Sequence, residues 1–311
     1  MIFAMHHFRI VAIALVKPFI TLLGIGGIAA ILAPALWSLI DGHYPLEKVF
    51  VKTTLGLLVL TAILAVKCTP FTQSRGSSKS SIHAQLMSLL GGWFTGIFIL
   101  SLPICLLLIL KLRSVDTDAL ASVDMILHDL ISAFSSGLLV GLVEEYIFRG
   151  WLMDWLQAKL KVLKSTGKFL AIIISAVDYS LIHFLKPATN PHNQSNTISA
   201  GLDVFLRSLI ELPQQCYVDT LLALFLAGVL LGLVKLFCNN GLLLVIGIHA
   251  GWVFSIKAMK ATTDPNLVKQ WQYLVGQDGI TGYLSAGWLG LLIVGLSYAL
   301  LTKQREEAAR E

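Results

Sequence analysis

The chain has 311 residues, of which 56% are hydrophobic and 13% charged, and its mean hydropathy is +0.78. These values exclude an ordinary soluble domain and indicate a polytopic membrane protein. The formal net charge of +5 requires no nucleic-acid partner, because basic loops beside membrane helices account for it.

Apolar segments that approach the length of a membrane span follow one another along the chain. They lie at 18–40, 53–66, 88–110, 126–148, 169–185, 219–238, 241–257 and 284–301. The second and fifth are short for a span and need tilt or flanking residues to cross the bilayer. The predicted fold class is therefore all-α, a polytopic integral membrane protein of seven or eight transmembrane helices with a central polar cavity.

Three parts of the chain are expected from this pattern. Residues 1–120 hold about three transmembrane helices, residues 121–260 hold the helices that carry charges, and residues 261–311 hold a loop, the last helix and a charged cytoplasmic tail. More Lys and Arg fall on the side of the N-terminus than on the other side, which predicts a cytoplasmic N-terminus. The scattered cysteines, such as Cys105 in an apolar span, are interpreted as buried thiols rather than a disulfide framework.

The connections between the apolar segments differ in character. A polar Gly/Ser-rich loop is expected at Thr72–Ser81, and the lysines of Lys159–Lys168 place that connection on the cytoplasmic side. The long stretch from Lys186 to Val218 contains a short amphipathic piece around Leu202–Leu212. We interpret this stretch as an ordinary surface loop in preference to a lid or an interfacial helix.

The stretch Gly141–Trp155, GLVEEYIFRGWLMDW, places Glu144, Glu145 and Arg149 inside an apolar run. A charge at the centre of a membrane helix costs roughly 2.5–3.5 kcal/mol on insertion scales, so such charges indicate a functional site that faces the protein interior. Glu145 and Arg149 are four residues apart and can pair on one helix face.

Glu144 points about 100° away from Glu145, so Arg149 leaves it comparatively free. A desolvated carboxylate without a tight counter-charge can act as a base toward water. The alternative interpretation is a structural Glu–Arg clamp between helices, with the other glutamate exposed at the interface.

Two later apolar segments carry ionisable side chains as well. Tyr179 and His183 are four residues apart on one face of the fifth segment. His249 lies in the seventh segment, where the small residues Gly247 and Gly251 allow a neighbouring helix or a substrate backbone to approach closely. A single membrane histidine is often only an interhelical hydrogen-bonding group, but two histidines and two glutamates on three apolar helices indicate a site.

This combination fits the hydrolysis of a carbonyl compound, most plausibly a peptide bond. A glutamate and a histidine that converge on one water form a general-base pair, and a second histidine can donate to a developing oxyanion. Glu144, His183 and His249 could instead bind zinc, since Glu and His are ordinary zinc ligands. However, no HExxH motif is present, and adjacent glutamates on a regular helix cannot both face one ion. We therefore expect no cofactor, with a divalent metal such as zinc as the open alternative.

The order of Glu-Glu-x-x-x-Arg, aromatic-x-x-x-His and a later helical His resembles the CAAX protease and bacteriocin-processing family, intramembrane proteases related to the type II CAAX prenyl endopeptidase. The resemblance covers roughly Ser136–Phe254. It implies that Glu144 is the base that activates water, that His183 assists it, and that His249 helps to hold the oxyanion. It also implies a glutamate-dependent mechanism, although members of the family have been described as metalloproteases.

Two positions depart from the family pattern. Tyr179 replaces the usual Phe, which adds a hydroxyl group, and Val253 stands where the family commonly has Asn four residues after the last His. Loss of one oxyanion donor typically costs about 10²–10³ in rate. The indole of Trp252, Tyr179 or Asn239 are candidates to replace the missing amide.

The function expected from the resemblance is that of an intramembrane endopeptidase acting on a membrane-anchored or hydrophobic peptide. The expected partners are this substrate and the lipid bilayer, without nucleic acid, and the expected location is a bacterial inner membrane. A non-catalytic immunity-like or scaffolding protein that retains the fold is the alternative, and Val253 favours it. A transporter that relays protons through its Glu, His and Arg side chains is a third interpretation.

The proposed pairing of Glu144 with His183 makes a demand on the helices that carry them. Both residues lie late in successive antiparallel segments, which would place them on opposite sides of the membrane. A fourth helix of about 30 residues that continues toward Lys159 would bring Glu144 nearer its middle. We therefore predict such a helix.

Overall fold

The computed structural model describes residues 2–68, 81–185, 187, 189–190, 194–266 and 271–308. The loop expected at Thr72–Ser81 therefore lies outside the described residues, apart from its last residue. Within the described residues, 7 helices are long and apolar enough to cross a membrane, which confirms an all-α polytopic membrane protein. These candidate spans are Arg9–Leu39, Ile82–Ile109, Val123–Lys159, Lys161–Ile182, Val218–Phe237, Gly241–Thr262 and Tyr283–Lys303.

The chain divides into two compact units that alternate along the sequence. The first unit comprises Met1–Thr72 and Trp151–Tyr217, and the second comprises Gln73–Gly150 and Val218–Glu311. Each unit is thus built from two separate stretches of chain. The three parts expected from the sequence divide the chain by which helices carry charged residues, and that division stays a prediction.

Helices α1 and α2 and the amphipathic helix α8 pack together in the first unit. Its elements are α1 (Ile2–Leu39), α2 (Leu46–Cys68), α6 (Met153–Lys159), η2 (Lys161–Leu163), α7 (Lys164–Ile182), α8 (Ile198–Ile210) and α9 (Leu212–Gln215). The segment expected at 53–66 lies within α2, which is not among the seven candidate spans.

Helix α8 corrects the interpretation of the stretch around it as an ordinary surface loop. The hydroxyl of Thr197 accepts the N–H of Ala200 and caps the helix at its start. Its inner face is made of small residues, and a Cβ added to Gly201 would meet the carbonyl of Ala30 on α1. Close packing of this amphipathic face, which the local sequence does not reveal, stabilises a helix that would be marginal alone.

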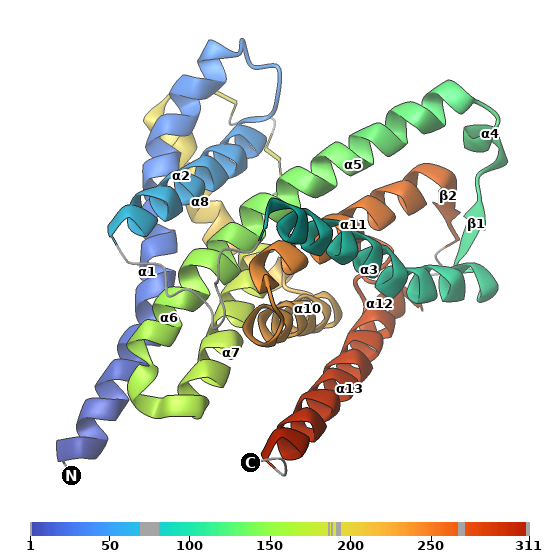
Figure 1. Cartoon of the computed structure of the whole chain (residues 1–311). Coiled ribbons are helices and arrows are strands. Elements are labelled where there is room, and N and C mark those ends of the chain that lie inside the picture. The colour runs from blue at the N-terminus through green and yellow to red at the C-terminus, as the bar shows by residue number, and fades with distance from the viewer. Residues whose placement is uncertain are drawn as a thin grey trace. The chain divides into compact units, whose positions relative to one another are not determined.

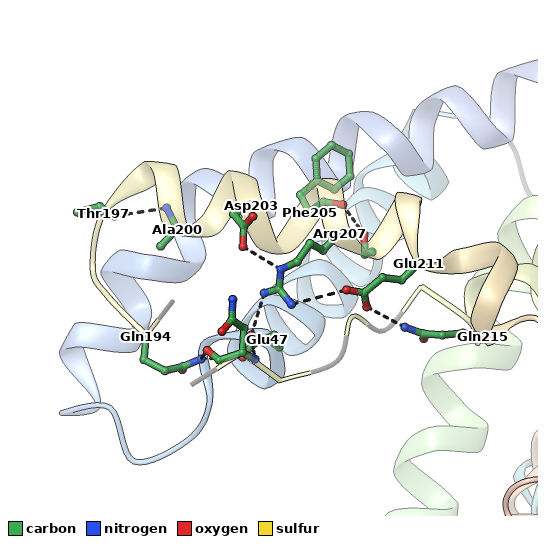
Figure 2. Close-up of polar contacts among 11 residues, drawn as sticks. Glu47, Gln194, Thr197, Ala200, Asp203, Phe205, Arg207, Glu211 and Gln215 are labelled. Carbon is green, nitrogen blue, oxygen red and sulfur yellow. Dashed lines mark hydrogen bonds and ion pairs between the residues drawn. The ribbon is translucent and has the colours of Figure 1, made fainter. Parts of the chain in front are cut away.

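A polar network fastens the start of α2 to α8 and to the segment before α8 (Figure 2). The carboxylate of Glu47 is only 3% exposed. It accepts the backbone N–H of Asn190 at 2.8 Å, Nε2 of Gln194 at 3.0 Å and Nη2 of Arg207 at 3.0 Å. Arg207 also donates through Nε to Asp203 at 2.8 Å. A buried charge held by this many donors fixes the register of the three segments.

The Glu47 network predicts acid-sensitive stability. Burial acts to raise the pKa of the Glu47 carboxyl, but the hydrogen bonds from Asn190, Gln194 and Arg207 together outweigh it and hold the pKa below its ordinary value. A carboxyl whose pKa is lower in the folded protein stabilises the fold above its unfolded pKa, and this contribution is lost as the pH falls through the folded value.

We therefore expect Glu47→Gln to melt below the wild type at pH 7, and the gap in melting temperature to close as the pH falls below about 4.3. Thermal unfolding of the detergent-solubilised protein across pH measures this gap. Glu306→Gln, which alters an exposed carboxyl, is the matched control and should give no such gap. A gap for Glu47→Gln that stays constant with pH would contradict the assignment.

Helix α11 is the central element of the second unit, because α3, α5 and α10 all contact it (Figure 1). The elements are α3 (Ile82–Ile109), β1 (Arg113–Val115), α4 (Thr117–Leu120), α5 (Val123–Glu145), η1 (Tyr146–Leu152), α10 (Val218–Phe237), α11 (Gly241–Thr262), β2 (Thr263–Pro265), α12 (Gln272–Val275) and α13 (Tyr283–Ala308), with η1 ending just past the unit's boundary. The antiparallel pair β1–β2 was not predicted, since three-residue strands leave no pattern. Cys105 is exposed on α3, so its interpretation as a buried thiol was wrong.

Glycines bring α11 and α3 into backbone contact. A Cβ added to Gly92 would meet the carbonyl of Leu244, and a Cβ added to Gly247 would meet the carbonyl of Leu89. Gly251 is equally close to the carbonyl of Trp93. The prediction that small residues around His249 admit a neighbouring helix is confirmed, and α3 is that helix.

The glycine contacts predict a sharp difference between two neighbouring positions. Gly92→Ala should destabilise the second unit by about 1–3 kcal/mol, because the new methyl group overlaps backbone that cannot move aside cheaply. Gly91→Ala, where a Cβ meets nothing within 4 Å, should be tolerated. Detergent melting curves and membrane accumulation of the two variants test this, and equal behaviour would argue against the close α3–α11 contact.

Candidate active site

One carboxylate oxygen, Oε1 of Glu145, is shared by two partners. It lies 2.8 Å from Nη1 of Arg149 and 2.8 Å from Nδ1 of His249. The three residues are 0%, 1% and 5% exposed. The i,i+4 pair of Glu145 with Arg149 is present as expected, whereas the bond to His249 was not predicted, because only the packing of α11 on α5 brings it there.

The helix changes its hydrogen-bonding pattern directly after Glu145. Helix α5 ends at that residue and continues as the π-helical segment η1, which carries Arg149. The candidate span Val123–Lys159 runs for 37 residues, in agreement with the predicted long fourth helix. π-helical turns occur often at functional sites, and the sequence contained no signal for this one.

Arg149 has a second contact that sequence analysis missed. Its Nη2 donates to the backbone carbonyl of Gly228 on α10 at 3.4 Å. Every residue has a backbone carbonyl, so the sequence contains no signal that identifies Gly228 as the acceptor. The buried guanidinium is therefore held from both α5 and α10.

Glu144 and His249 face one another across a short gap. Oε2 of Glu144 lies 3.9 Å from Nε2 of His249, and the Glu144 side chain is 20% exposed. Because Nδ1 of His249 faces the Glu145 carboxylate, that nitrogen carries a proton and donates it. With Nδ1 engaged in this way, Nε2 is the ring nitrogen that faces the Glu144 carboxylate. This arrangement suits proton transfer.

Tyr179 and His183 belong to the first unit. Helix α7 ends at Ile182 and His183 is its C-cap residue. Nδ1 of His183 lies 2.7 Å from the carbonyl of Tyr179, and the two rings are 4.7 Å apart. This contact fixes which nitrogen of His183 faces its own helix. The convergence of His183 with Glu144 on one water stays a prediction.

Trp252 and Val253 lie on α11, in the turn after His249. The Trp252 ring centroid is 6.3 Å from that of His249, and the Trp252 side chain is 6% exposed. Its Nε1 has no hydrogen-bond partner among the described residues, and such a buried donor costs about 1–3 kcal/mol. The half-buried Val253 offers no polar atom.

A metal site would need several His, Cys, Asp or Glu side chains close together. Among the described residues, no group of three or more His, Cys, Asp or Glu side chains is arranged to hold an ion. The Glu145 carboxylate is engaged by a guanidinium and an imidazole. Glu144 and His249 belong to the second unit and His183 to the first, so the zinc alternative through these three residues stays a prediction.

Residues 126–255 of the chain match the family of type II CAAX prenyl endopeptidases described as Rce1-like. This segment is similar to that family. The family is one of CAAX-type endopeptidases, and the apolar helices make the protein an integral membrane protein. Searches of curated proteins and of solved structures give no match to the chain.

The Rce1-like segment includes every site residue expected from the sequence. It runs from the first turns of α5 to Ser255 on α11. It therefore contributes to both units, since α5 and α11 belong to the second unit and α7 to the first. The resemblance seen in the sequence motifs is confirmed.

The shared oxygen of Glu145 predicts different responses at the two adjacent glutamates. Glu145→Gln removes the carboxylate that lies 2.8 Å from the buried Arg149 cation and should destabilise the protein by about 3–5 kcal/mol. Glu144→Gln removes a partly exposed carboxylate with no direct ion pair to Arg149 and should change stability far less. Thermal unfolding in detergent measures both.

A double variant separates charge from shape. Glu145→Gln combined with Arg149→Met removes both charges and should recover part of the lost stability, because a buried pair replaced by neutral groups is often near neutral. Additive losses in the double variant would show that the ion pair is not the cause.

Proposed function

We propose that the protein is an intramembrane endopeptidase that hydrolyses a peptide bond of a membrane-associated or hydrophobic peptide. Water activated by Glu144 is the nucleophile. The observation that carries this proposal is the gap between Glu144 and Nε2 of His249, with the other imidazole nitrogen fixed by a buried carboxylate. The match of residues 126–255 to a family of CAAX prenyl endopeptidases supports it.

The reaction begins when Glu144 removes a proton from water as the water oxygen bonds to the carbonyl carbon. The π electron pair of the carbonyl passes to its oxygen, which becomes an oxyanion. The oxyanion then re-forms the C=O bond as the C–N bond breaks, and the nitrogen leaves with the electron pair and takes the proton from Glu144. One water is consumed, and an acid and an amine are released.

The remaining site residues position Glu144 and His249. Glu145 holds Nδ1 of His249 and so aims Nε2 at Glu144, where a protonated imidazole can donate to the oxyanion. Arg149 neutralises Glu145 and ties it to α10 through Gly228. His183 is proposed to share the water with Glu144, and Tyr179 to support His183.

The proposed substrate is a peptide with a membrane anchor, and a prenylated CAAX peptide is the first probe because of the family. The proposed location is a bacterial inner membrane with the N-terminus in the cytoplasm. No metal is proposed to take part. Activity should therefore survive dialysis against 1,10-phenanthroline. If activity is lost on dialysis and recovers when zinc is added, the metal-dependent mechanism is favoured instead.

Glu144→Gln should lower kcat by about 10²–10⁴, the usual contribution of a general base, while the protein still folds. The assay follows cleavage of an internally quenched peptide with a farnesylated cysteine by the purified full-length protein in lipid. Asp129→Asn, the same chemical change at an exposed position of α5, is the control and should leave kcat unchanged. Full activity in Glu144→Gln would remove the proposed base.

The same variant in the native host identifies the substrate. Peptide termini of the membrane proteome that vanish in Glu144→Gln, and persist with Asp129→Asn, are those that the protein generates. If no terminus changes but deletion of the gene has a phenotype, the second candidate function holds. That candidate is a non-catalytic immunity-like or scaffolding protein, favoured by the apolar Val253 beside the site.

A further inference from the structure

The indole N–H of Trp252 is a buried donor that the activity proposed above does not use. Two other indoles do have acceptors: Nε1 of Trp288 donates to the carbonyl of Ile99 at 2.8 Å, and Nε1 of Trp37 donates to the carbonyl of Tyr44 at 2.8 Å. Nε1 of Trp252 has no partner among the described residues, although its side chain is only 6% exposed. A buried donor without a partner in the described part of the chain can receive an acceptor from outside the chain.

The position of Trp252 indicates which acceptor it receives. Trp252 is one helical turn after His249 on α11, and the two ring centroids are 6.3 Å apart with 52° between the planes. An oxygen that accepts two hydrogen bonds lies about 2.7–3.1 Å from each donor nitrogen. Nitrogens on the edges of two rings at this separation can meet on one oxygen. His249 itself faces Glu144, so this oxygen would lie at the proposed reaction centre.

We propose that Nε1–H of Trp252 donates to the substrate's carbonyl oxygen as that oxygen becomes an oxyanion. This inference rests on the proposed endopeptidase function and adds a catalytic residue to it. The indole is suited to the role because it is a donor only and carries no charge to titrate. Its proton stays on the nitrogen throughout, while the π electron pair of the carbonyl moves to the oxygen and back.

The packing of Trp252 explains how the donor is held. Its ring belongs to a hydrophobic cluster with Leu100 of α3, Leu230 of α10 and Leu289 of α13. A donor fixed by packing on several helices needs no rearrangement when the charge develops, which is the condition for oxyanion stabilisation. Val253, the next residue, supplies no competing polar group.

The test replaces the donor and keeps the ring. Trp252→Phe in the full-length protein in lipid should lower kcat on the farnesylated quenched peptide about 10²-fold, with KM changed less than threefold. Affinity for a phosphinate analogue of that peptide, which mimics the tetrahedral intermediate, should fall in parallel with kcat/KM. Benzothienylalanine at the same position, which keeps the bicyclic shape and lacks the N–H, should reproduce the loss and excludes a packing defect as its cause.

Trp288→Phe is the matched control, because it removes a structural indole bond in the same unit. It should lower the melting temperature and leave kcat unchanged. If the wild type cleaves the peptide and the benzothienylalanine variant has the same kcat, the role of Trp252 is overturned and the endopeptidase proposal stays intact. Absence of turnover in the wild type, on this peptide and on the termini found in the host, overturns both.

Discussion

A single buried oxygen, Oε1 of Glu145, joins the guanidinium of Arg149 to the imidazole of His249. In a low-dielectric interior each of these charges is costly alone, and they stabilise one another while the carbonyl of Gly228 accepts from Arg149. The orientation of His249 depends on this oxygen. So does the separation between Nε2 of His249 and Glu144, on which the proposed chemistry rests.

This electrostatic group can form only because the backbones around it lie close together. A Cβ added to Gly141 on α5 would meet the carbonyl of Ile246 at 2.8 Å, and one added to Gly137 would meet that of Ala250 at 2.7 Å. Glycines on α3 and α11 bring those helices equally close. His249 thus lies on a helix that glycine contacts hold from two sides, so packing positions its backbone and the Glu145 carboxylate orients its ring.

Much of this arrangement could be predicted from the sequence, and the rest depends on contacts that local pattern does not encode. Charges in an apolar run revealed Glu144, Glu145 and Arg149, and helical spacing gave the Glu145–Arg149 pair. The bond from His249 to Glu145 joins residues 104 positions apart, so only tertiary packing determines it. The α8 helix was misinterpreted because its stability comes from Ala30 and its neighbours on α1, and the π-helical turn has no sequence signature.

The spacing along the chain also matters for how the protein is made. When α5 enters the membrane during synthesis, the helix that carries His249 does not yet exist, and α10 with Gly228 has not been translated. Arg149 follows Glu145 by four residues, so the carboxylate has a counter-charge as soon as the helix forms. The Glu145–Arg149 pair therefore lowers the cost of inserting a glutamate into the hydrocarbon core during biogenesis. The hydrogen bond from His249 of α11 to the same oxygen forms last.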